Sequence, residues 1–249
     1  MGDTQTPILA LREIHKAFGG ITAIQAFNLD IMPGEIVALV GDNGAGKSTL
    51  VKIIAGVFPA TSGQIVLGGE EVHFANPRQS QDRGIQVVYQ DLALADSQPV
   101  YMNMFLGREK VKGLLRRLDR KAMISETEEL VRALDVRIPS ARARIRELSG
   151  GQRQGVAIAR ATHGAGKLIL MDEPTAALGV AETARVENSI RTLKADNRAI
   201  LIVSHNLDQV FRLADRICVL RRGVQVGVKR TSETTNNEIV SMITGLISS

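Results

Sequence analysis

Gly41-Asp42-Asn43-Gly44-Ala45-Gly46-Lys47-Ser48 fits the pattern G-x-x-x-x-G-K-[ST] of nucleotide phosphate loops. The apolar run Glu35–Val40 before it predicts a short buried strand, and Ser48–Gly56 after it predicts a helix with one apolar face. A loop between a strand and a helix N-terminus directs backbone N–H groups and the helix dipole at an anion. The combination of motif and flanking elements disfavours the alternative, an ordinary glycine-rich turn.

The motif predicts a specific role for its last two residues. Lys47 is placed to reach the β- and γ-phosphates of a nucleoside triphosphate, and Ser48 to offer its hydroxyl to Mg²⁺. The predicted nucleotide-binding residues are Gly41, Asp42, Asn43, Gly44, Ala45, Gly46, Lys47, Ser48 and Thr49.

Composition limits the alternatives without selecting a function. A chain of 249 residues with 44% hydrophobic and 23% charged residues is ordinary for a soluble globular protein of one large or two small domains. The net charge of +5 permits an anionic partner, whether nucleotide, membrane surface or nucleic acid. We interpret the basic runs Arg108–Lys121 and Arg132–Arg146 as a solvated, helix-rich face.

The single cysteine and the lack of long apolar runs bear on location. Cys218 lies in the apolar run Ile217–Leu220, so we expect a buried strand cysteine, which suits a reducing compartment. The first 16 residues lack the apolar core of a signal peptide, and no apolar run approaches the roughly 20 residues that span a bilayer. We expect a chain that is soluble by itself and acts at a membrane only through partner subunits.

The hydrophobic pattern changes twice along the chain. Phe27, Leu29 and Ile31 alternate with polar residues, and Gln64–Phe74 resembles a hairpin, so the first 75 residues predict an antiparallel β-layer around the phosphate loop. Helical spacing dominates from about residue 92 to residue 162. From Lys167 onward, strands and helices alternate again. The predicted elements there are strand Leu168–Met171, helix Val180–Ala195, strand Ala199–Ser204, helix Leu207–Leu213, two short strands and helix Glu238–Thr244. The layout predicts an α/β fold, a parallel-sheet core with an inserted helical segment.

A second motif supplies carboxylates. Leu168-Ile169-Leu170-Met171-Asp172-Glu173-Pro174 describes a buried strand that ends in two acids, the Walker B arrangement. Asp172 is placed to hold Mg²⁺, and Glu173 to orient or deprotonate the attacking water. Adjacent acids often only cap a helix, but the phosphate loop upstream makes that interpretation the weaker one.

A third motif, Leu148-Ser149-Gly150-Gly151-Gln152, precedes the predicted helix Arg153–Thr162. A serine hydroxyl and free N–H groups at a helix start form a second anion site, or else a simple helix cap. The residues alone do not show why one chain needs two phosphate-binding helix starts.

In this order and spacing, the three motifs resemble the ATP-binding subunit of ABC transporters, whose signature is L-S-G-G-Q. The resemblance implies the RecA-like P-loop NTPase fold in a single domain, 1–249, with a helical subdomain, 92–162, that carries the signature. It also implies a head-to-tail homodimer that sandwiches two ATP molecules. Ser149, Gly150, Gly151 and Gln152 of one subunit then face the γ-phosphate held by Lys47 of the other.

Three further positions match the family. Gln90 matches the Q-loop glutamine, which approaches Mg²⁺ and the attacking water; His205 matches the switch histidine, which contacts the γ-phosphate; Phe18 matches the aromatic residue that stacks on adenine. The alternatives are a surface glutamine, a structural histidine and a core strand phenylalanine.

One position departs from the family. Where many members have S-x-L-D after the Walker B proline, this chain reads Thr175-Ala176-Ala177-Leu178-Gly179, so glycine replaces an interface aspartate and puts coupling between the two sites in doubt. The same segment, the residues after the signature and Asn103–Glu109 resemble the carbohydrate-import branch, the ribose- and fructose-type sugar importers.

The resemblance implies an ATP- and Mg²⁺-dependent ATPase that energises import of a sugar of the monosaccharide class. Its implied partners are a second copy, polytopic permease subunits at the cytoplasmic face of the plasma (inner) membrane and, indirectly, an extracytoplasmic sugar-binding protein. The alternatives are transport of another small solute, or a soluble ABC ATPase acting on nucleic acid or ribosomes. The latter lacks support because no long coiled coil separates the Walker motifs and only one ATPase unit is present, so we expect no nucleic-acid partner. A non-hydrolysing regulatory module is disfavoured because Lys47, Asp172, Glu173 and His205 are all present.

Overall fold

The computed structural model describes residues 6–113, 115–163, 166–176 and 178–246. These residues form two compact units, which we call the sheet unit and the helical unit. The sheet unit comprises the chain up to Val87, Gly166–Glu173 and the chain from Leu193; the helical unit comprises the chain from Val88 to the gap at 164–165, and Pro174–Thr192. The predicted helical subdomain, 92–162, falls within the first stretch of the helical unit. Ala177, inside the segment that resembles sugar importers, lies outside the described residues.

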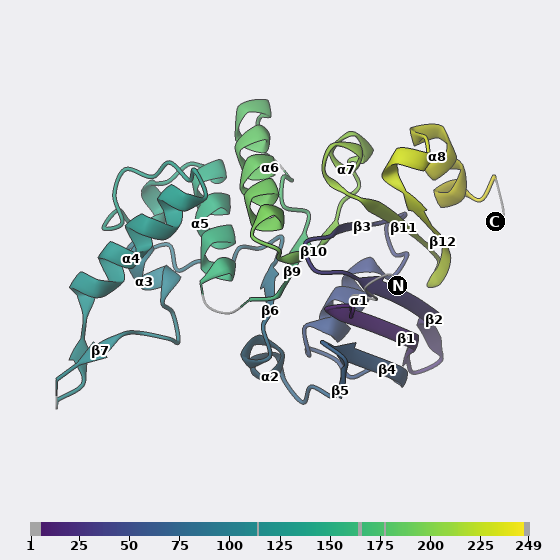
Figure 1. Ribbon diagram of the computed structural model, residues 1–249, viewed down its shortest axis with the longest axis horizontal. Coiled ribbons are helices and arrows are strands. Elements are labelled where there is room, and N and C mark those ends of the chain that lie inside the picture. Colours follow the sequence, from purple (N-terminus) through teal and green to yellow (C-terminus); the bar gives the residue numbers. More distant parts are fainter. Residues whose placement is uncertain (1–5, 114, 164–165, 177, 247–249) are drawn as a thin grey trace, which may run out of the picture. The chain divides into compact units, whose positions relative to one another are not determined.

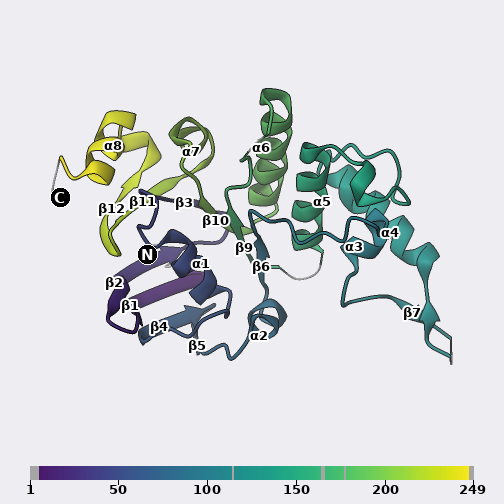
Figure 2. The same cartoon turned by 180° about the vertical axis from the view of Figure 1, so that it is seen from behind.

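The elements follow one another in the order seen in Figures 1 and 2. The strands are β1 Leu9–Phe18, β2 Ile21–Ile31, β3 Ile36–Val40, β4 Ser62–Leu67, β5 Glu70–Val72, β6 Ile85–Val88, β7 Val111–Lys112, β8 Arg117–Leu118, β9 Leu168–Asp172, β10 Ala199–Val203, β11 Arg216–Arg221 and β12 Val224–Arg230. The helices are α1 Lys47–Ile54, α2 Pro77–Asp82, α3 Val100–Met104, α4 Arg120–Ala133, α5 Gly150–Thr162, α6 Val180–Ala195, α7 Leu207–Leu213 and α8 Asn236–Thr244, with short 3₁₀ turns at Ile145–Glu147 and Thr231–Glu233. Among these described residues, no helix combines the length and apolar character needed to cross a bilayer.

Within the described residues, one sheet joins both kinds of strand in the order β5-β4-β1-β2-β12-β11-β3-β10-β9-β6. Strands β11, β3, β10 and β9 pair in parallel, whereas β1, β2, β4 and β5 pair antiparallel. The central strands β3 and β10 are buried at every residue, as continuous apolar runs covered on both faces should be. The predicted α/β fold is confirmed. The antiparallel strands are not a detached layer but continue the sheet through a short parallel pairing of β12 with β2.

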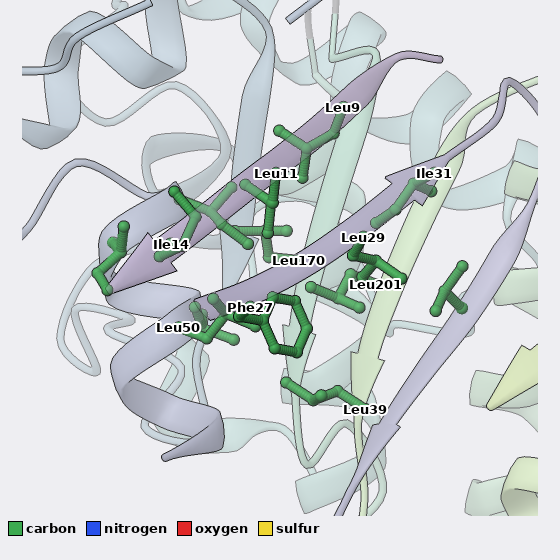
Figure 3. Close-up of a cluster of buried hydrophobic side chains, with 14 of the residues drawn as sticks. Leu9, Leu11, Ile14, Phe27, Leu29, Ile31, Leu39, Leu50, Leu170 and Leu201 are labelled. Carbon is green, nitrogen blue, oxygen red and sulfur yellow. The ribbon is translucent and has the colours of Figure 1, made fainter. Parts of the chain in front are cut away.

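Helix α1 lies between the two halves of this sheet. It contacts β2 on one side and β9 on the other. Its side chains Leu50, Ile53 and Ile54 are fully buried, as their helical spacing predicted. Figure 3 shows Leu50 beside Phe27 of β2, with side chains of β1, β9 and β10 in the same cluster. A helix of eight residues is marginal by itself, so this packing is what holds α1 in place.

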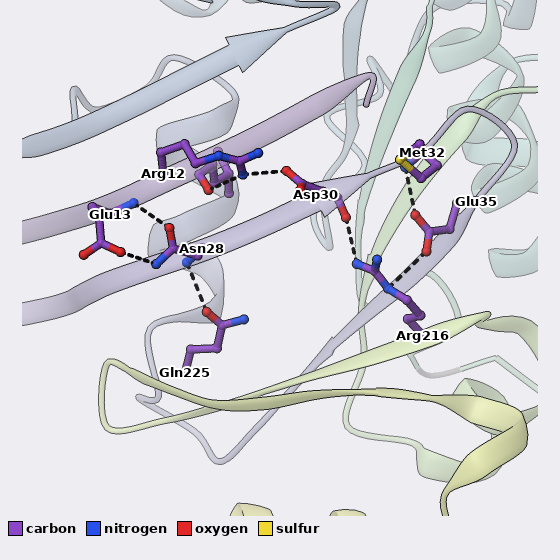
Figure 4. Close-up of polar contacts among 9 residues, drawn as sticks. Arg12, Glu13, Asn28, Asp30, Met32, Glu35, Arg216 and Gln225 are labelled. Carbon is purple, nitrogen blue, oxygen red and sulfur yellow. Dashed lines mark hydrogen bonds and ion pairs between the residues drawn. The ribbon is translucent and has the colours of Figure 1, made fainter. Parts of the chain in front are cut away.

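Polar contacts tie the antiparallel strands to the parallel ones (Figure 4). The Arg216 guanidinium of β11 donates to the main-chain oxygen of Asp30 at 2.7 Å and forms an ion pair with Glu35 at 3.1 Å. The Gln225 side chain of β12 accepts a hydrogen bond from the N–H of Asn28 at 3.0 Å. These bonds reinforce a junction where the strand pairing itself is short.

The helical unit packs α3, α4 and α5 against one another. The helical spacing noted between residues 92 and 162 is present in α4, where Met123, Thr127 and Val131 are buried. The interpretation of Arg108–Lys121 as helix-rich was wrong, because β7 and β8 form a small antiparallel hairpin there. Cys218, by contrast, is the buried strand cysteine that its apolar neighbours predicted, and burial raises its pKa to about 12.

Truncation of the core around α1 should destabilise the sheet unit. Phe27 is fully buried, so Phe27→Ala leaves a cavity and should destabilise the protein by about 3–5 kcal/mol. Ile21 on the same strand is 74% exposed, and Ile21→Ala should change the free energy of unfolding by less than about 0.5 kcal/mol. Denaturant titration of both variants measures the difference; equal effects would contradict the position of this core.

Candidate functional site

The phosphate loop can adopt its fold only with glycine at two positions. Gly41 has a φ of 151°, and a Cβ there would lie 2.0 Å from the main-chain oxygen of Leu220. Gly46, the residue before α1, has a left-handed φ of 107°, and its Cβ would lie 2.6 Å from the main-chain oxygen of Ala23. The loop is therefore pressed against β11 and β2, and its backbone has no room for a side chain at either point.

This loop ends at the N-terminus of α1. The first N–H groups of any α-helix have no acceptor within the helix, so Lys47, Ser48 and Thr49 direct N–H groups out of α1 at its positive end. The Lys47 ammonium folds back and donates to the main-chain oxygens of Gly41 at 2.6 Å and Asp42 at 2.8 Å. Burial lowers the pKa of Lys47, while the nearby carboxylates of Glu173 and Asp172 oppose that shift. Together these groups form a positively polarised helix start that suits phosphate oxygens.

The two acids of the Walker B strand meet this loop within the sheet unit. Asp172 is the last residue of β9, and its carboxyl lies near the hydroxyl of Ser48. Burial, and secondly the charge of Glu173, raise the pKa of Asp172 above its ordinary value, whereas the Ser48 hydroxyl acts to lower it. The structure thus brings together Ser48 and Asp172, two of the three residues predicted to bind the metal.

Glu173 and His205 form a pair. The Glu173 carboxylate lies 2.8 Å from Nδ1 of His205, and its side chain is 15% exposed whereas that of His205 is 72% exposed. The backbone of Glu173 has a φ of 51°, a left-handed conformation that costs a glutamate about 1–3 kcal/mol. The N–H of Glu173 donates to the main-chain oxygen of Val203 at 2.9 Å, which helps to hold this conformation. His205 is thus an exposed histidine directed at a carboxylate, and its role as the switch histidine stays a prediction.

Phe18 lies at the end of β1 and is 45% exposed, so it is not a core residue. Its ring meets the edge of Phe58 at 5.4 Å between centroids, and the Lys16 ammonium lies 4.9 Å from its centroid. An aromatic ring that is close to positive charge and nearly half exposed suits stacking on a base.

The signature residues begin α5 in the helical unit. The Ser149 hydroxyl accepts from the N–H of Gln152 at 3.3 Å, and the Gln152 side chain accepts from the N–H of Ser149 at 2.9 Å, a complete capping box. The cap that sequence analysis offered as the alternative is therefore present. A residue that sequence analysis did not single out, Glu182, also binds here: its carboxylate accepts from the Ser149 hydroxyl at 3.0 Å and from the N–H of Gly151 at 3.3 Å.

Two other positions also lie in the helical unit. Gln90 is exposed in a bend two residues after β6. Gly179, which replaces the interface aspartate, is exposed and lies directly before α6, where a Cβ would meet no atom within 4 Å. Glycine at 179 is consequently not required by packing.

Comparisons with known proteins agree with this geometry. The sequence profile described as "ABC transporter" matches residues 24–176. The chain belongs to the ABC transporter family. It is accordingly an ATPase of the ATP-binding cassette type. It is 44% identical over 237 residues to the xylose/arabinose import ATP-binding protein XylG of Sulfolobus acidocaldarius, with 95% of this chain and 94% of that protein covered.

A second sequence relative and a solved structure agree with this assignment. The fructose import ATP-binding protein FrcA of Rhizobium meliloti is 41% identical over 247 residues, covering 97% of this chain and 95% of FrcA. The crystal structure of the ADP conformation of MJ1267, an ATP-binding cassette of an ABC transporter, superposes with a TM-score of 0.81 at 25% identity, covering 96% of this chain and 95% of that one. The predicted P-loop NTPase fold is thereby confirmed.

Neutralisation of Asp172 should stabilise the nucleotide-free ATPase at neutral pH. Because the folded-state pKa of Asp172 is raised, its ionised form is less favourable in the folded than in the unfolded chain. This penalty is complete above the folded-state pKa and vanishes below the ordinary value of 3.8. Asp172→Asn should therefore raise Tm at pH 7, and the gain should shrink as the pH falls towards 3.8.

Asp119→Asn is the matched control, because hydrogen bonding to the N–H of Ala122 lowers the pKa of that acid. Its ionised form is favoured in the folded chain, so its neutralisation should not raise Tm at pH 7. A lower Tm for Asp172→Asn than for the parent at pH 7 would contradict the electrostatic account of the site.

Proposed function

We propose that this ABC ATPase hydrolyses ATP to energise import of a sugar, of the monosaccharide class, through partner membrane subunits. The observation that carries the proposal is the convergence, in one unit, of a phosphate loop, the Ser48–Asp172 pair and the Glu173–His205 pair. The substrate class rests on two relatives reported above, XylG and FrcA, which are named as xylose/arabinose and fructose import ATP-binding proteins. The alignment with this chain covers nearly the whole length of each.

On ATP binding, the residues of the phosphate loop exchange protein contacts for phosphate contacts. Lys47 leaves the main-chain oxygens of Gly41 and Asp42 and binds the β- and γ-phosphate oxygens, which are charged and therefore stronger acceptors. The N–H groups at the start of α1 bind the same phosphates. Phe18 stacks its exposed face on the adenine.

The donor set at Ser48 and Asp172 fits Mg²⁺. A hydroxyl and a carboxylate are hard oxygen ligands, and Mg²⁺ sites are completed by water and substrate phosphate oxygens rather than by further protein acids. When bound, the ion neutralises charge on the phosphates and thereby assists displacement of the γ-phosphate. We further propose Gln90 as a ligand of this ion, on the basis of its match to the family position.

The hydrolytic step falls to Glu173. Its carboxylate orients the attacking water and accepts its proton, and the contact with Nδ1 of His205 at 2.8 Å holds the carboxylate in place. His205 binds the other side of that carboxylate and, being exposed, is free to turn to the γ-phosphate. Glu173 and His205 thus act as a unit on the same phosphate.

The remaining ligands come from a second copy of the chain. Ser149, Gly150, Gly151 and Gln152 start α5 with N–H groups and a hydroxyl, the donors that a γ-phosphate requires. In a head-to-tail homodimer, the signature of one subunit completes the phosphate loop of the other, which accounts for two anion-binding helix starts in one chain. ATP binding then closes the dimer, and hydrolysis with product release reopens it.

The work of the ATPase is delivered to polytopic permease subunits at the cytoplasmic face of the plasma (inner) membrane, where this chain sits peripherally. We place their contact on the helical unit near Gln90, since an exposed loop that also senses nucleotide links the two events. An extracytoplasmic sugar-binding protein completes the system, and no nucleic acid is involved.

Reconstitution in liposomes tests the proposal. With its permease pair and sugar-binding protein present, ATP hydrolysis should rise when the cognate monosaccharide is added, and labelled sugar should accumulate on the side that bears the ATPase. Glu173→Gln is the control and should slow both rates by roughly 10²–10⁴ because it removes the base. Stimulation by DNA or ribosomes instead of the membrane partners would contradict the proposal, and uptake of another solute would contradict the substrate class.

A further inference from the structure

Glu182 places a carboxylate on the anion site of the signature. One oxygen, Oε1, accepts from the Ser149 hydroxyl at 3.0 Å and from the N–H of Gly151 at 3.3 Å. The other, Oε2, accepts from the N–H of Gly179 at 3.4 Å, one turn back at the start of α6. Glu182 therefore bridges the N-termini of α5 and α6, although it lies 33 residues after Ser149 in the sequence.

The contact engages the donors that a phosphate would need. A hydroxyl, a backbone N–H and the positive end of α5 are the groups that bind an anionic oxygen at a helix start. The hydrogen bond from Ser149 is the main cause that lowers the pKa of Glu182, so this side chain is ionised at neutral pH. An ionised carboxylate and a γ-phosphate cannot share the same two donors.

Packing on the signature glycine holds this arrangement. A Cβ at Gly151 would lie 2.8 Å from the Cβ, Cγ and Cδ atoms of Glu182. Because residue 151 has no side chain, the Glu182 side chain can lie directly against the backbone of α5. Glu182 thus contacts the start of α5 both through its carboxylate and through its methylene groups, which pack against Gly151.

We propose that Glu182 is an internal anion that occupies the signature until the γ-phosphate of the partner's ATP displaces it. This inference rests on the proposed function, in which the signature receives ATP from a second chain. Glu182 thereby raises the ATP concentration at which the dimer closes, and it returns to Ser149 when phosphate leaves, which favours reopening. Displacement needs a rotation of one partly buried side chain, whereas closure has to supply a better anion.

The test measures ATP-driven dimerisation in the Glu173→Gln background, where hydrolysis does not reopen the dimer. Glu182→Gln keeps the size and the acceptor oxygen but loses the charge. The ATP concentration for half-maximal dimerisation, measured by analytical ultracentrifugation, should fall about five- to tenfold, the effect of weakening one charge-assisted hydrogen bond. Glu129→Gln, at an exposed position of α4, makes the same change of net charge and should leave that concentration unchanged.

Glu182→Asp distinguishes loss of the contact with Ser149 from loss of the acid at the start of α6. It keeps an acid in the first turn of α6, but the shorter side chain does not reach Ser149, so dimerisation should again need less ATP. If both Glu182 variants need as much ATP as the parent, or more, Glu182 is a structural cap and the inference is overturned. If the Glu173→Gln parent itself stays monomeric at saturating ATP, the dimer of the proposed function fails, and the inference fails with it.

Discussion

The arrangement of the sheet unit depends on holding the positively polarised N-terminus of α1 against the phosphate loop. Its first N–H groups have no acceptor within the helix and face a loop that glycine alone can form. Because α1 has only eight residues, its direction is set by burial of Leu50, Ile53 and Ile54 between the antiparallel and parallel strands. The polar bonds of Arg216 and Gln225 reinforce the junction between these two sets of strands, where β12 and β2 share only a short pairing.

The same constraint leaves the nucleotide-free site in an unfavourable state. Lys47 is partly desolvated, the pKa of Asp172 is raised, and Glu173 has a strained backbone. Each group is unfavourable in the free protein and favourable beside phosphate and metal, so ligand binding relieves energy that folding stored. In the helical unit the situation is reversed, because Glu182 already satisfies the signature. The start of α1 presents its donors to an external anion, whereas the start of α5 already binds a carboxylate of the same chain.

The sequence predicted most of the sheet unit. Motif spacing located Lys47, Asp172 and Glu173, and continuous apolar runs located β3, β9 and β10, since buried parallel strands have a distinctive composition. Helical spacing found α4, α6 and α7. The role of the signature in a second chain came from family resemblance, because no local pattern shows that a donor faces another molecule.

What the sequence missed depends on tertiary contacts. The β7–β8 hairpin has strands of two residues, too short for any alternation, and lies in a basic run that resembles a helix surface. The helical unit takes its second stretch, Pro174–Thr192, from beyond the Walker B strand. Glu182 was overlooked for the same reason. Its spacing from Gly179 marks an ordinary helix start, and only the folded unit brings it to Ser149.

The central claim, that each ATP site is shared between two chains, is tested most directly by complementation. Lys47→Ala removes the phosphate-binding cation but leaves the signature intact, and Ser149→Arg blocks the signature but leaves the phosphate loop intact. Each variant alone should be inactive. When the Ser149→Arg chain is titrated with the Lys47→Ala chain, ATPase activity should return and reach a plateau, because the mixed dimer holds one intact site built from both chains. If the mixed dimer forms and no activity returns, or if the Ser149→Arg chain is active by itself, the shared site does not exist.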